Sequence, residues 1–274
     1  MKKVLLFVLV VISIVLGYTL AGPLPYDAKD NISGLVREQK TPILRVALVT
    51  DSGGENDLLG RALAQAQGIG INSVIGLGDW TQVGTLDDLS AVKQVFDNSK
   101  LEYFVLSGDH DDWDSRNRGE EATSNFEQVF GEPTQVLDKN GVRIVLLDNS
   151  DIYKGISESD WKVLSDALSG DEKLKLVFVH KTPFHPSSAH IMGADSAVVA
   201  SQAQNLTGLL EERKVSGLFT GDLHFFAKFK SPDGSVRITT IGAVASERNF
   251  QGPRFSILTV YSDYSWDVED VEIR

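Results

Sequence analysis

The stretch that decides the fold is 43–53, ILRVALVTDSG, in which a run of apolar residues leads directly into an acid and a glycine. The run Ile43–Thr50 has the composition of a β-strand. A helical pattern follows at Asn56–Gly68, where leucine and alanine recur at helical spacing. Short apolar runs continue to alternate with helical patterns along the chain. This alternation indicates an α/β fold.

The remaining elements follow from the same two patterns. We expect strands at Val74–Leu77, Tyr103–Ser107, Val142–Leu147, Leu174–Val179 and Gly217–Thr220, and helices at Leu86–Phe96, Ser157–Leu168 and Ser201–Lys214. The last three apolar segments, at 236–241, 256–261 and 266–273, are predicted to be antiparallel strands. No second linker interrupts the pattern, so residues 43–274 are expected to form one domain.

Acids and histidines stand at or just after the ends of five predicted strands. They are Asp51, Asp79, Asp109, His180 and Asp222, and His224 lies two residues beyond the last. One such residue alone would more often cap a turn or a helix. Ligands of open α/β sheets bind beyond the carboxyl ends of the strands, so five together are expected to meet in one pocket. Crowded carboxylates repel unless cations neutralise them, which predicts a divalent metal site with two ions.

The motifs around these residues occur in a characteristic order. They are Asp51-Ser52-Gly53, Gly78-Asp79-Trp80-Thr81-Gln82, Gly108-Asp109-His110-Asp111, Val177-Phe178-Val179-His180 and Gly221-Asp222-Leu223-His224. In this order the chain resembles the calcineurin-like metallophosphoesterase family, and its purple-acid-phosphatase-like branch in particular. The resemblance runs from about Val46 to the C-terminus. It implies an α/β fold that is a four-layer α-β-β-α sandwich of two mixed β-sheets.

The resemblance also implies a role for each motif residue. Asp79 would bridge two metal ions. The other implied ligands are Asp51 and His224 for the first ion, and Asp109, His180 and Asp222 for the second. A metal-bound hydroxide would attack the phosphorus of a phosphomonoester or phosphodiester in line. His110, with Asp111 as its partner, would then protonate the leaving group as a general acid.

Three positions depart from the family pattern. Gln82 stands where the purple enzymes have a tyrosine ligand, Asp109 replaces an asparagine, and Asp222 replaces a histidine. The oxygen-rich ligand set favours manganese, iron or magnesium over zinc, whose sites prefer imidazole and thiolate. The added negative charge repels a dianionic monoester more than a monoanionic diester. We therefore expect diesters to be at least competitive as substrates.

Weaker candidates and exclusions complete the site. His185 and His190 follow His180 in a loop and are weak candidates for substrate binding, although surface positions fit them equally well. The chain has 38 acidic and 26 basic residues and a formal net charge of −12, which argues against a nucleic-acid-binding patch. It has no cysteine, which excludes disulfides and thiolate-bound metals within this sequence.

The N-terminal segment differs from the rest of the chain. Lys2 and Lys3 precede the apolar run 4–21, which at about 1.5 Å per residue is long enough to span a bilayer core. Residues 1–22 are therefore predicted to be a signal peptide or an N-terminal membrane anchor, with the domain on the extracytoplasmic side, or secreted after cleavage. Residues 23–42 are predicted to be a linker.

Taken with the resemblance, these patterns predict an exported, metal-dependent phosphoesterase that acts as a monomer on a small phosphoester. The alternative is a non-catalytic metal-binding relative of the fold that recognises a phosphorylated or surface ligand. The intact His110–Asp111 pair favours the enzyme, since a binding module gains nothing from an acid beside the metals. The altered first-metal site, where Gln82 replaces a ligand, favours the alternative.

Overall fold

The computed structural model describes residues 40–274. Residues Pro42–Arg274 form one compact unit. The predicted signal or anchor at 1–22 lies outside the described residues, and so does most of the predicted linker at 23–42. Within 40–274, the helices are too short or too polar for any of them to be a candidate membrane span.

Two mixed sheets form the centre of the unit. The first has the order β11-β10-β1-β2-β3, and the second has the order β4-β5-β6-β7-β9-β8. The strands of the first sheet are β1 (Pro42–Val49), β2 (Ser73–Gly76), β3 (Glu102–Val105), β10 (Arg254–Tyr261) and β11 (Trp266–Glu272). Those of the second are β4 (Gln135–Lys139), β5 (Val142–Leu146), β6 (Leu174–Val179), β7 (Gly217–Thr220), β8 (Ala227–Lys230) and β9 (Arg237–Thr240). In the first sheet β1, β2 and β3 run parallel, and β10 and β11 add an antiparallel edge. In the second sheet β5, β6, β7 and β9 run parallel, and β4 and β8 form antiparallel edges.

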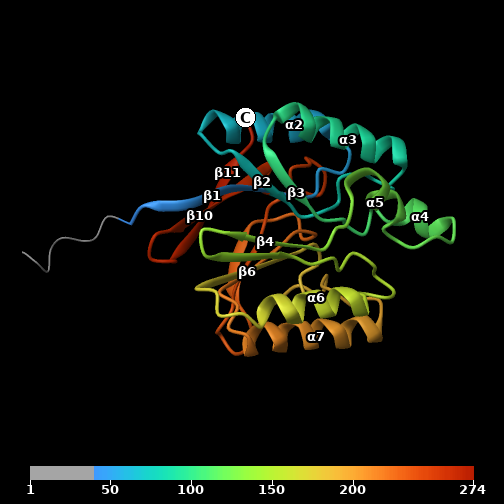
Figure 1. Cartoon of the computed structure of the whole chain (residues 1–274). Helices are drawn as coiled ribbons and strands as arrows, with labels where there is room; N and C mark the ends of the chain where they lie inside the picture. Colours follow the sequence, from blue (N-terminus) through green and yellow to red (C-terminus); the bar gives the residue numbers. More distant parts are fainter. Residues whose placement is uncertain (1–39) are drawn as a thin grey trace, which may run out of the picture. The chain divides into compact units, whose positions relative to one another are not determined.

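Helices cover the outer face of each sheet, as Figure 1 shows. On the first sheet lie α2 (Asn56–Gly68) and α3 (Leu86–Ser99), and on the second lie α6 (Glu158–Leu168) and α7 (Ala197–Glu212). Two short helices, α4 (Trp113–Asn117) and α5 (Ser124–Phe130), lie in the connection from β3 to β4. The predicted four-layer α-β-β-α sandwich is confirmed.

The burial of β1 explains why its sequence is apolar at successive positions. Ala47 and Val49 pack in the core between the first sheet and its helices. Val46 and Leu48 face the core between the two sheets. A strand that is buried on both faces has no side exposed to solvent, so its sequence does not alternate between apolar and polar residues.

The structure corrects some expected boundaries. The predicted helix Ser201–Lys214 begins earlier, at Ala197, because the Ser196 side chain accepts a hydrogen bond from the Val199 N–H and caps the helix there. The segment predicted at 236–241 becomes β9, which pairs in parallel with β7 and antiparallel with β8 in the second sheet. The prediction of antiparallel strands is correct for the pair β10 and β11.

Candidate metal centre

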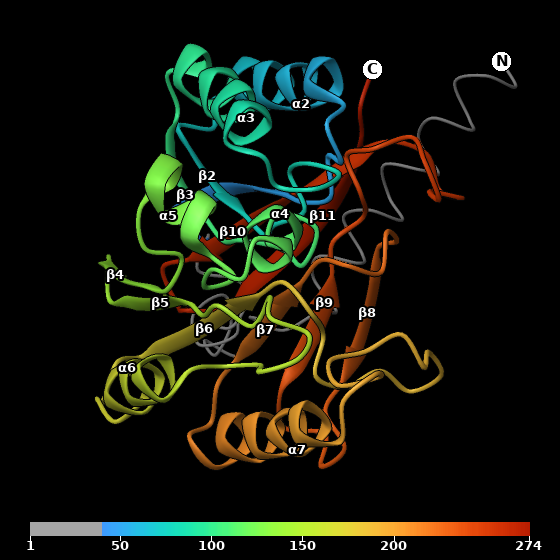
Figure 2. The same ribbon diagram turned by 90° about the vertical axis from the view of Figure 1, so that its right-hand side faces the viewer.

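The predicted acids and histidines follow the ends of strands from both sheets, and Figure 2 shows the two sheets between their covering helices. Asp51, Asp79 and Asp109 follow β1, β2 and β3 of the first sheet, whereas His180 and Asp222 follow β6 and β7 of the second. The backbone N–H of Asp222 donates to both carboxylate oxygens of Asp51, at 3.2 Å each. The site therefore lies between the sheets, and each sheet contributes ligands.

Left-handed backbone conformations mark the point where the strands stop. The φ angles are 53° at Asp51, 56° at Asp79, 65° at Asp222 and 57° at His224. Aspartate adopts this conformation more readily than most residues, although it remains uncommon. Such outliers persist where the surrounding structure determines them, and they concentrate at functional sites.

Gly108 is required by the close approach of Asp79. A Cβ on Gly108 would lie 2.2 Å from both the backbone nitrogen and Oδ1 of Asp79. The backbone N–H of His110, two residues after Gly108, donates to the same Asp79 Oδ1 at 3.0 Å. The glycine therefore allows the loop after β3 to hold the Asp79 carboxylate through its backbone.

His180 is oriented as a metal ligand usually is. Its Nδ1–H donates to the backbone carbonyl of Leu77 at 2.7 Å, and the ring is fully buried. This leaves Nε2 facing acids, 3.2 Å from Asp109 Oδ1 and 3.4 Å from Asp79 Oδ1. Metal-bound histidines commonly donate their second ring N–H to a carbonyl, which fixes the tautomer. His224 Nε2 likewise lies 3.5 Å from Asp51 Oδ1.

Burial and neighbouring charges shift the pKa values of these groups. Burial raises the pKa of Asp51 to about 6, against the opposing effect of His224 and His180. Burial also opposes ionisation of Asp222, but the hydrogen bond from His190 and the charge of Lys181 outweigh it and lower the pKa of Asp222 to about 2. Burial favours neutral His180, yet the nearby acids raise the pKa of His180 above its ordinary value.

The side chains fit a divalent cation in two overlapping groups. Ligand atoms of Asp51, Asp79 and His180 lie within 4.8 Å of one another, and so do those of Asp109, His180 and Asp222. Asp222 Oδ2 is buried without a hydrogen-bond partner, an acceptor that a cation would satisfy. Carboxylate oxygens with one imidazole suit manganese, iron and magnesium. The donor set thus agrees with a metal centre.

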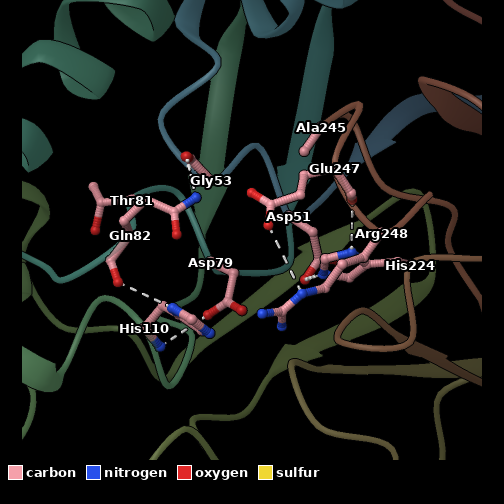
Figure 3. A pocket seen from close by; sticks show the side chains of 10 residues that line it. All are labelled: Asp51, Gly53, Asp79, Thr81, Gln82, His110, His224, Ala245, Glu247 and Arg248. Atoms are coloured by element: carbon pink, nitrogen blue, oxygen red, sulfur yellow. Dashed lines mark hydrogen bonds and ion pairs between the residues drawn. The ribbon is translucent and has the colours of Figure 1, made fainter.

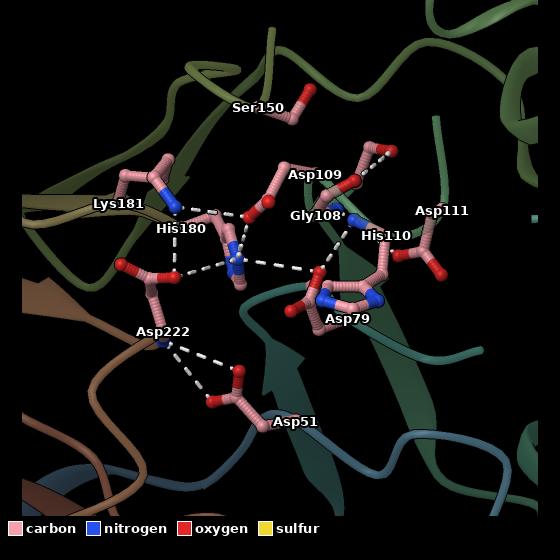
Figure 4. Close-up of polar contacts among 12 residues, drawn as sticks. Asp51, Asp79, Gly108, Asp109, His110, Asp111, Ser150, His180, Lys181 and Asp222 are labelled. Atoms are coloured by element: carbon pink, nitrogen blue, oxygen red, sulfur yellow. Dashed lines mark hydrogen bonds and ion pairs between the residues drawn. The ribbon is translucent and has the colours of Figure 1, made fainter. Parts of the chain in front are cut away.

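Lys181 belongs to the site and was not predicted from the sequence. Its Nζ lies 3.0 Å from Asp109 Oδ1 and 2.8 Å from Asp222 Oδ1 (Figure 4). Burial favours the neutral amine, but Asp222 and Asp109 outweigh it and raise the pKa of Lys181 above its ordinary value. The sequence signal that could have identified Lys181 is its position beside His180 at a strand end, in a chain with two extra acids at this site.

Asp111 does not pair with His110 as the sequence suggested. The Asp111 carboxylate is fully buried and accepts hydrogen bonds from the backbone N–H groups of Trp80, Thr81 and Gly108. The His110 ring instead places Nδ1 3.0 Å from the carbonyl of Gln82 and stacks on Trp113. The tight turn after β3 points the side chains of His110 and Asp111 in different directions. The Asp111 carboxylate therefore accepts hydrogen bonds from backbone N–H groups that would otherwise be unpaired.

An open pocket gives access to part of the centre (Figure 3). Its walls are formed by Asp51, Gly53, Asp79, Thr81, Gln82, His110, His224, Ala245, Glu247 and Arg248. The Gln82 side chain donates to the Gly53 carbonyl at 2.8 Å, so it holds the loop after β1. Arg248 is exposed on the pocket wall, next to Glu247.

The two weaker histidine candidates have different positions. His190 Nε2 lies 3.1 Å from Asp222 Oδ1, which brings this loop residue to the edge of the centre. His185 packs its ring against Phe225 and Phe229, and its Nδ1 accepts hydrogen bonds from the N–H groups of Ser187 and Ser188. His185 therefore holds its own loop together.

Solved structures share this fold. A dimetal phosphatase from Danio rerio is 16% identical with a TM-score of 0.63, and the alignment covers 85% of this chain and 100% of that one. Purple acid phosphatase PPD1 from yellow lupin is 14% identical with a TM-score of 0.62, covering 82% of this chain and 51% of the lupin chain. GAP50, described as the anchor in the inner membrane complex of Plasmodium, is 15% identical with a TM-score of 0.55, covering 85% and 90%.

A comparison with curated protein sequences finds no match. The sequence pattern of calcineurin-like phosphoesterases, in contrast, matches residues 44–226. This range contains all six predicted metal ligands, from Asp51 to His224. The chain therefore belongs to the calcineurin-like phosphoesterase family, whose members are metal-dependent phosphoesterases.

Proposed function

We propose that this protein is a hydrolase of small phosphoesters that uses metal held at the strand ends between the two sheets. The observation that supports this most directly is the position of His180 Nε2 among acids of both sheets, 3.2 Å from Asp109 and 3.4 Å from Asp79. A neutral ring nitrogen facing carboxylates at this distance is unfavourable unless a cation lies near them or the ring is protonated. A metal resolves the conflict and explains the tautomer.

A bound divalent ion would supply a nucleophile derived from water at neutral pH and would neutralise charge on the phosphoryl oxygens. The residues that would hold it are Asp51, Asp79 and His180, with His224 beside Asp51. The predicted second ion, at Asp109, His180 and Asp222, remains a prediction.

Residues of the pocket wall have roles in positioning and proton transfer. We assign His110 as the proton donor to the leaving group, through Nε2, because the Gln82 carbonyl holds Nδ1 and Trp113 supports the ring face. The Arg248 guanidinium, which lines the same pocket, supplies a positive charge for the phosphoryl oxygens. Both residues lie on the side of the centre that solvent reaches.

The charge of the centre supports the expected substrate and metal preferences. Asp51, Asp79, Asp109 and Asp222 bring four acids together, and Lys181 is the one lysine or arginine that contacts any of them in an ion pair among residues 40–274. This oxygen-rich set supports manganese, iron or magnesium over zinc. It also supports phosphodiesters as substrates at least as good as monoesters, since repulsion grows with substrate charge.

The test combines metal analysis with a substrate panel. The purified protein is expected to retain divalent metal and to hydrolyse aryl phosphodiesters and phosphomonoesters, with activity lost in chelator. Asp79→Asn should lose metal and activity, whereas Asp171→Asn, the same change in the exposed turn before β6, should lose neither. Metal binding without hydrolysis of any ester would support the non-catalytic alternative, and absence of metal after loading would contradict both.

We also propose that the domain is exported and held at the membrane by residues 1–22 or released by their cleavage. The basis is the sequence alone, since this segment lies outside the described residues. External protease should degrade the domain in spheroplasts. Full protection there would contradict the placement.

A further inference from the structure

The Lys181 ammonium lies within one of the two groups of side chains that could hold a metal. That group consists of Asp109, His180 and Asp222. Nζ of Lys181 lies 3.0 Å from Asp109 Oδ1 and 2.8 Å from Asp222 Oδ1, and Figure 4 shows it between the two carboxylates. The lysine side chain is only 8% exposed. A positive charge therefore already joins the acids of this group.

We propose that Lys181 supplies the second cation of the centre, so that the protein binds one divalent ion per chain, at Asp51, Asp79 and His180. The inference rests on the proposed function, in that it takes the other group to be a metal site. It replaces the predicted second ion by an ammonium that the chain itself provides.

A metal ion bound through Asp109 Oδ1 or Asp222 Oδ1 would compete with this ammonium for the same oxygen. An ion bonded to Asp222 Oδ1 at about 2.1 Å would lie within about 5 Å of Nζ, because that nitrogen is 2.8 Å from the same oxygen. Positive charges at this separation repel strongly in a buried site. Asp222 Oδ1 also faces His190 Nε2 at 3.1 Å, so two side chains already contact the oxygen.

Hydrogen bonds with the Asn149 side chain fix the backbone of Lys181 in this position. Asn149 Oδ1 accepts the N–H groups of both His180 and Lys181 at 3.0 Å, and Asn149 Nδ2 donates to the Lys181 carbonyl at 2.7 Å. Asn149 is itself buried. The end of β6 is thus held so that two adjacent residues reach the same acids, one through an imidazole and one through an ammonium.

The access of solvent agrees with a single exchangeable ion. Asp51 and Asp79 of the proposed site line the open pocket, and buried His180 lies behind them. Asp109, Asp222 and Lys181 are not among the pocket walls within residues 40–274. Asp109 and Asp222 are also the two positions at which acids replace neutral residues of the family pattern. The two acids that depart from the family pattern are therefore the same two acids that the Lys181 ammonium contacts.

The number and coupling of bound ions test the inference without an activity assay. The purified protein and Lys181→Ala would be dialysed against Mn²⁺, metal per chain measured by elemental analysis, and the spin state recorded by electron paramagnetic resonance. We expect one uncoupled Mn²⁺ per chain in the wild type and a spin-coupled pair in Lys181→Ala. Lys162→Ala, which removes an exposed lysine of α6, should behave as the wild type.

Each outcome separates the inference from the proposed function. Two coupled ions in the wild type would overturn the inference and leave the metal-dependent hydrolase standing. One ion in folded Lys181→Ala would overturn the role of the ammonium. A wild type that binds no manganese would overturn the proposed function and the inference with it. The wild-type count needs no variant, so it decides the point even if Lys181→Ala does not fold.

Discussion

Replacing Asp111 is expected to reduce stability, because its carboxylate organises the loops of the site. The buried carboxylate accepts the N–H groups of Trp80, Thr81 and Gly108 and the hydroxyl of Thr81. Leaving a buried donor unpaired costs about 1–3 kcal/mol. Asp111→Asn turns an NH₂ group toward one of these donors and should lower the free energy of unfolding by about 2 kcal/mol. Asp111→Ala leaves three N–H groups unpaired and should lower it by about 3 kcal/mol or more.

The effect of Asp111→Asn should depend on pH. Burial and then repulsion from Asp79 raise the pKa of Asp111 from 3.8 to about 7. An acid with a raised pKa in the folded state adds stability that is complete below its ordinary pKa and lost as the pH rises through the raised value. Between pH 5 and 8.5 the wild type should lose up to about 3 kcal/mol through this group, at 1.36 kcal/mol per pKa unit. The deficit of the variant is therefore expected to be largest at pH 5 and to disappear by pH 8.5, because the wild type loses as much stability through Asp111 as the substitution costs.

Urea unfolding followed by tryptophan fluorescence at pH 5 and 8.5 measures both effects. Chelator keeps metal away from Asp79, which would otherwise weaken the repulsion. The matched control is Asp171→Asn, an exposed aspartate that should show neither effect. Unchanged stability in Asp111→Asn, combined with a selective loss of activity on esters with poor leaving groups, would refute the structural role and restore the pairing with His110.

Three further outcomes follow from the site. His110→Ala should reduce hydrolysis of alkyl esters by about 10²–10⁴-fold and of nitrophenyl esters far less, since only a poor leaving group needs the proton; equal losses would contradict the assignment. Asn149→Ala should weaken metal binding in calorimetry by about 10–100-fold through loss of its hold on His180, and unchanged affinity would show that β6 alone positions the ring. Gly108→Ala should abolish metal binding, because its Cβ would lie 2.2 Å from Asp79 Oδ1; normal loading would mean that the loop can move aside.

The cluster of acids could be predicted from the sequence because the prediction required only the positions at which the strands end. Parallel strands bring their carboxyl ends to one edge, so Asp51, Asp79 and Asp109 had to be neighbours once their strands were recognised. The apolar runs before them differ in length, from eight residues in β1 to four in β2 and β3, but each leads within a few residues to an acid, which makes the strand ends easy to identify. The same argument placed His180 and Asp222 in this pocket, and the family resemblance added that the strands belong to two sheets.

Direct contacts between side chains could not be predicted in the same way. Asp111 follows His110 in sequence, but the turn directs the Asp111 carboxylate to backbone N–H groups of another loop. Lys181 is adjacent to a predicted ligand, yet a lysine at a strand end is most often solvated, and only the fold shows its burial. The strands β4 and β8 were missed because each has a half-exposed, mixed sequence at a sheet edge.

Because the candidate ligands are divided between the two sheets, a bound metal ion would act as a cross-link. Asp51 and Asp79 belong to loops of the first sheet, whereas His180 follows a strand of the second. An ion bound by all three would join the halves of the sandwich as a disulfide joins two segments, except that the bond is reversible. Ligand binding to the folded state alone adds stability that grows with the logarithm of ligand concentration. The resistance of the domain to unfolding and to proteases would then follow the free metal concentration around it.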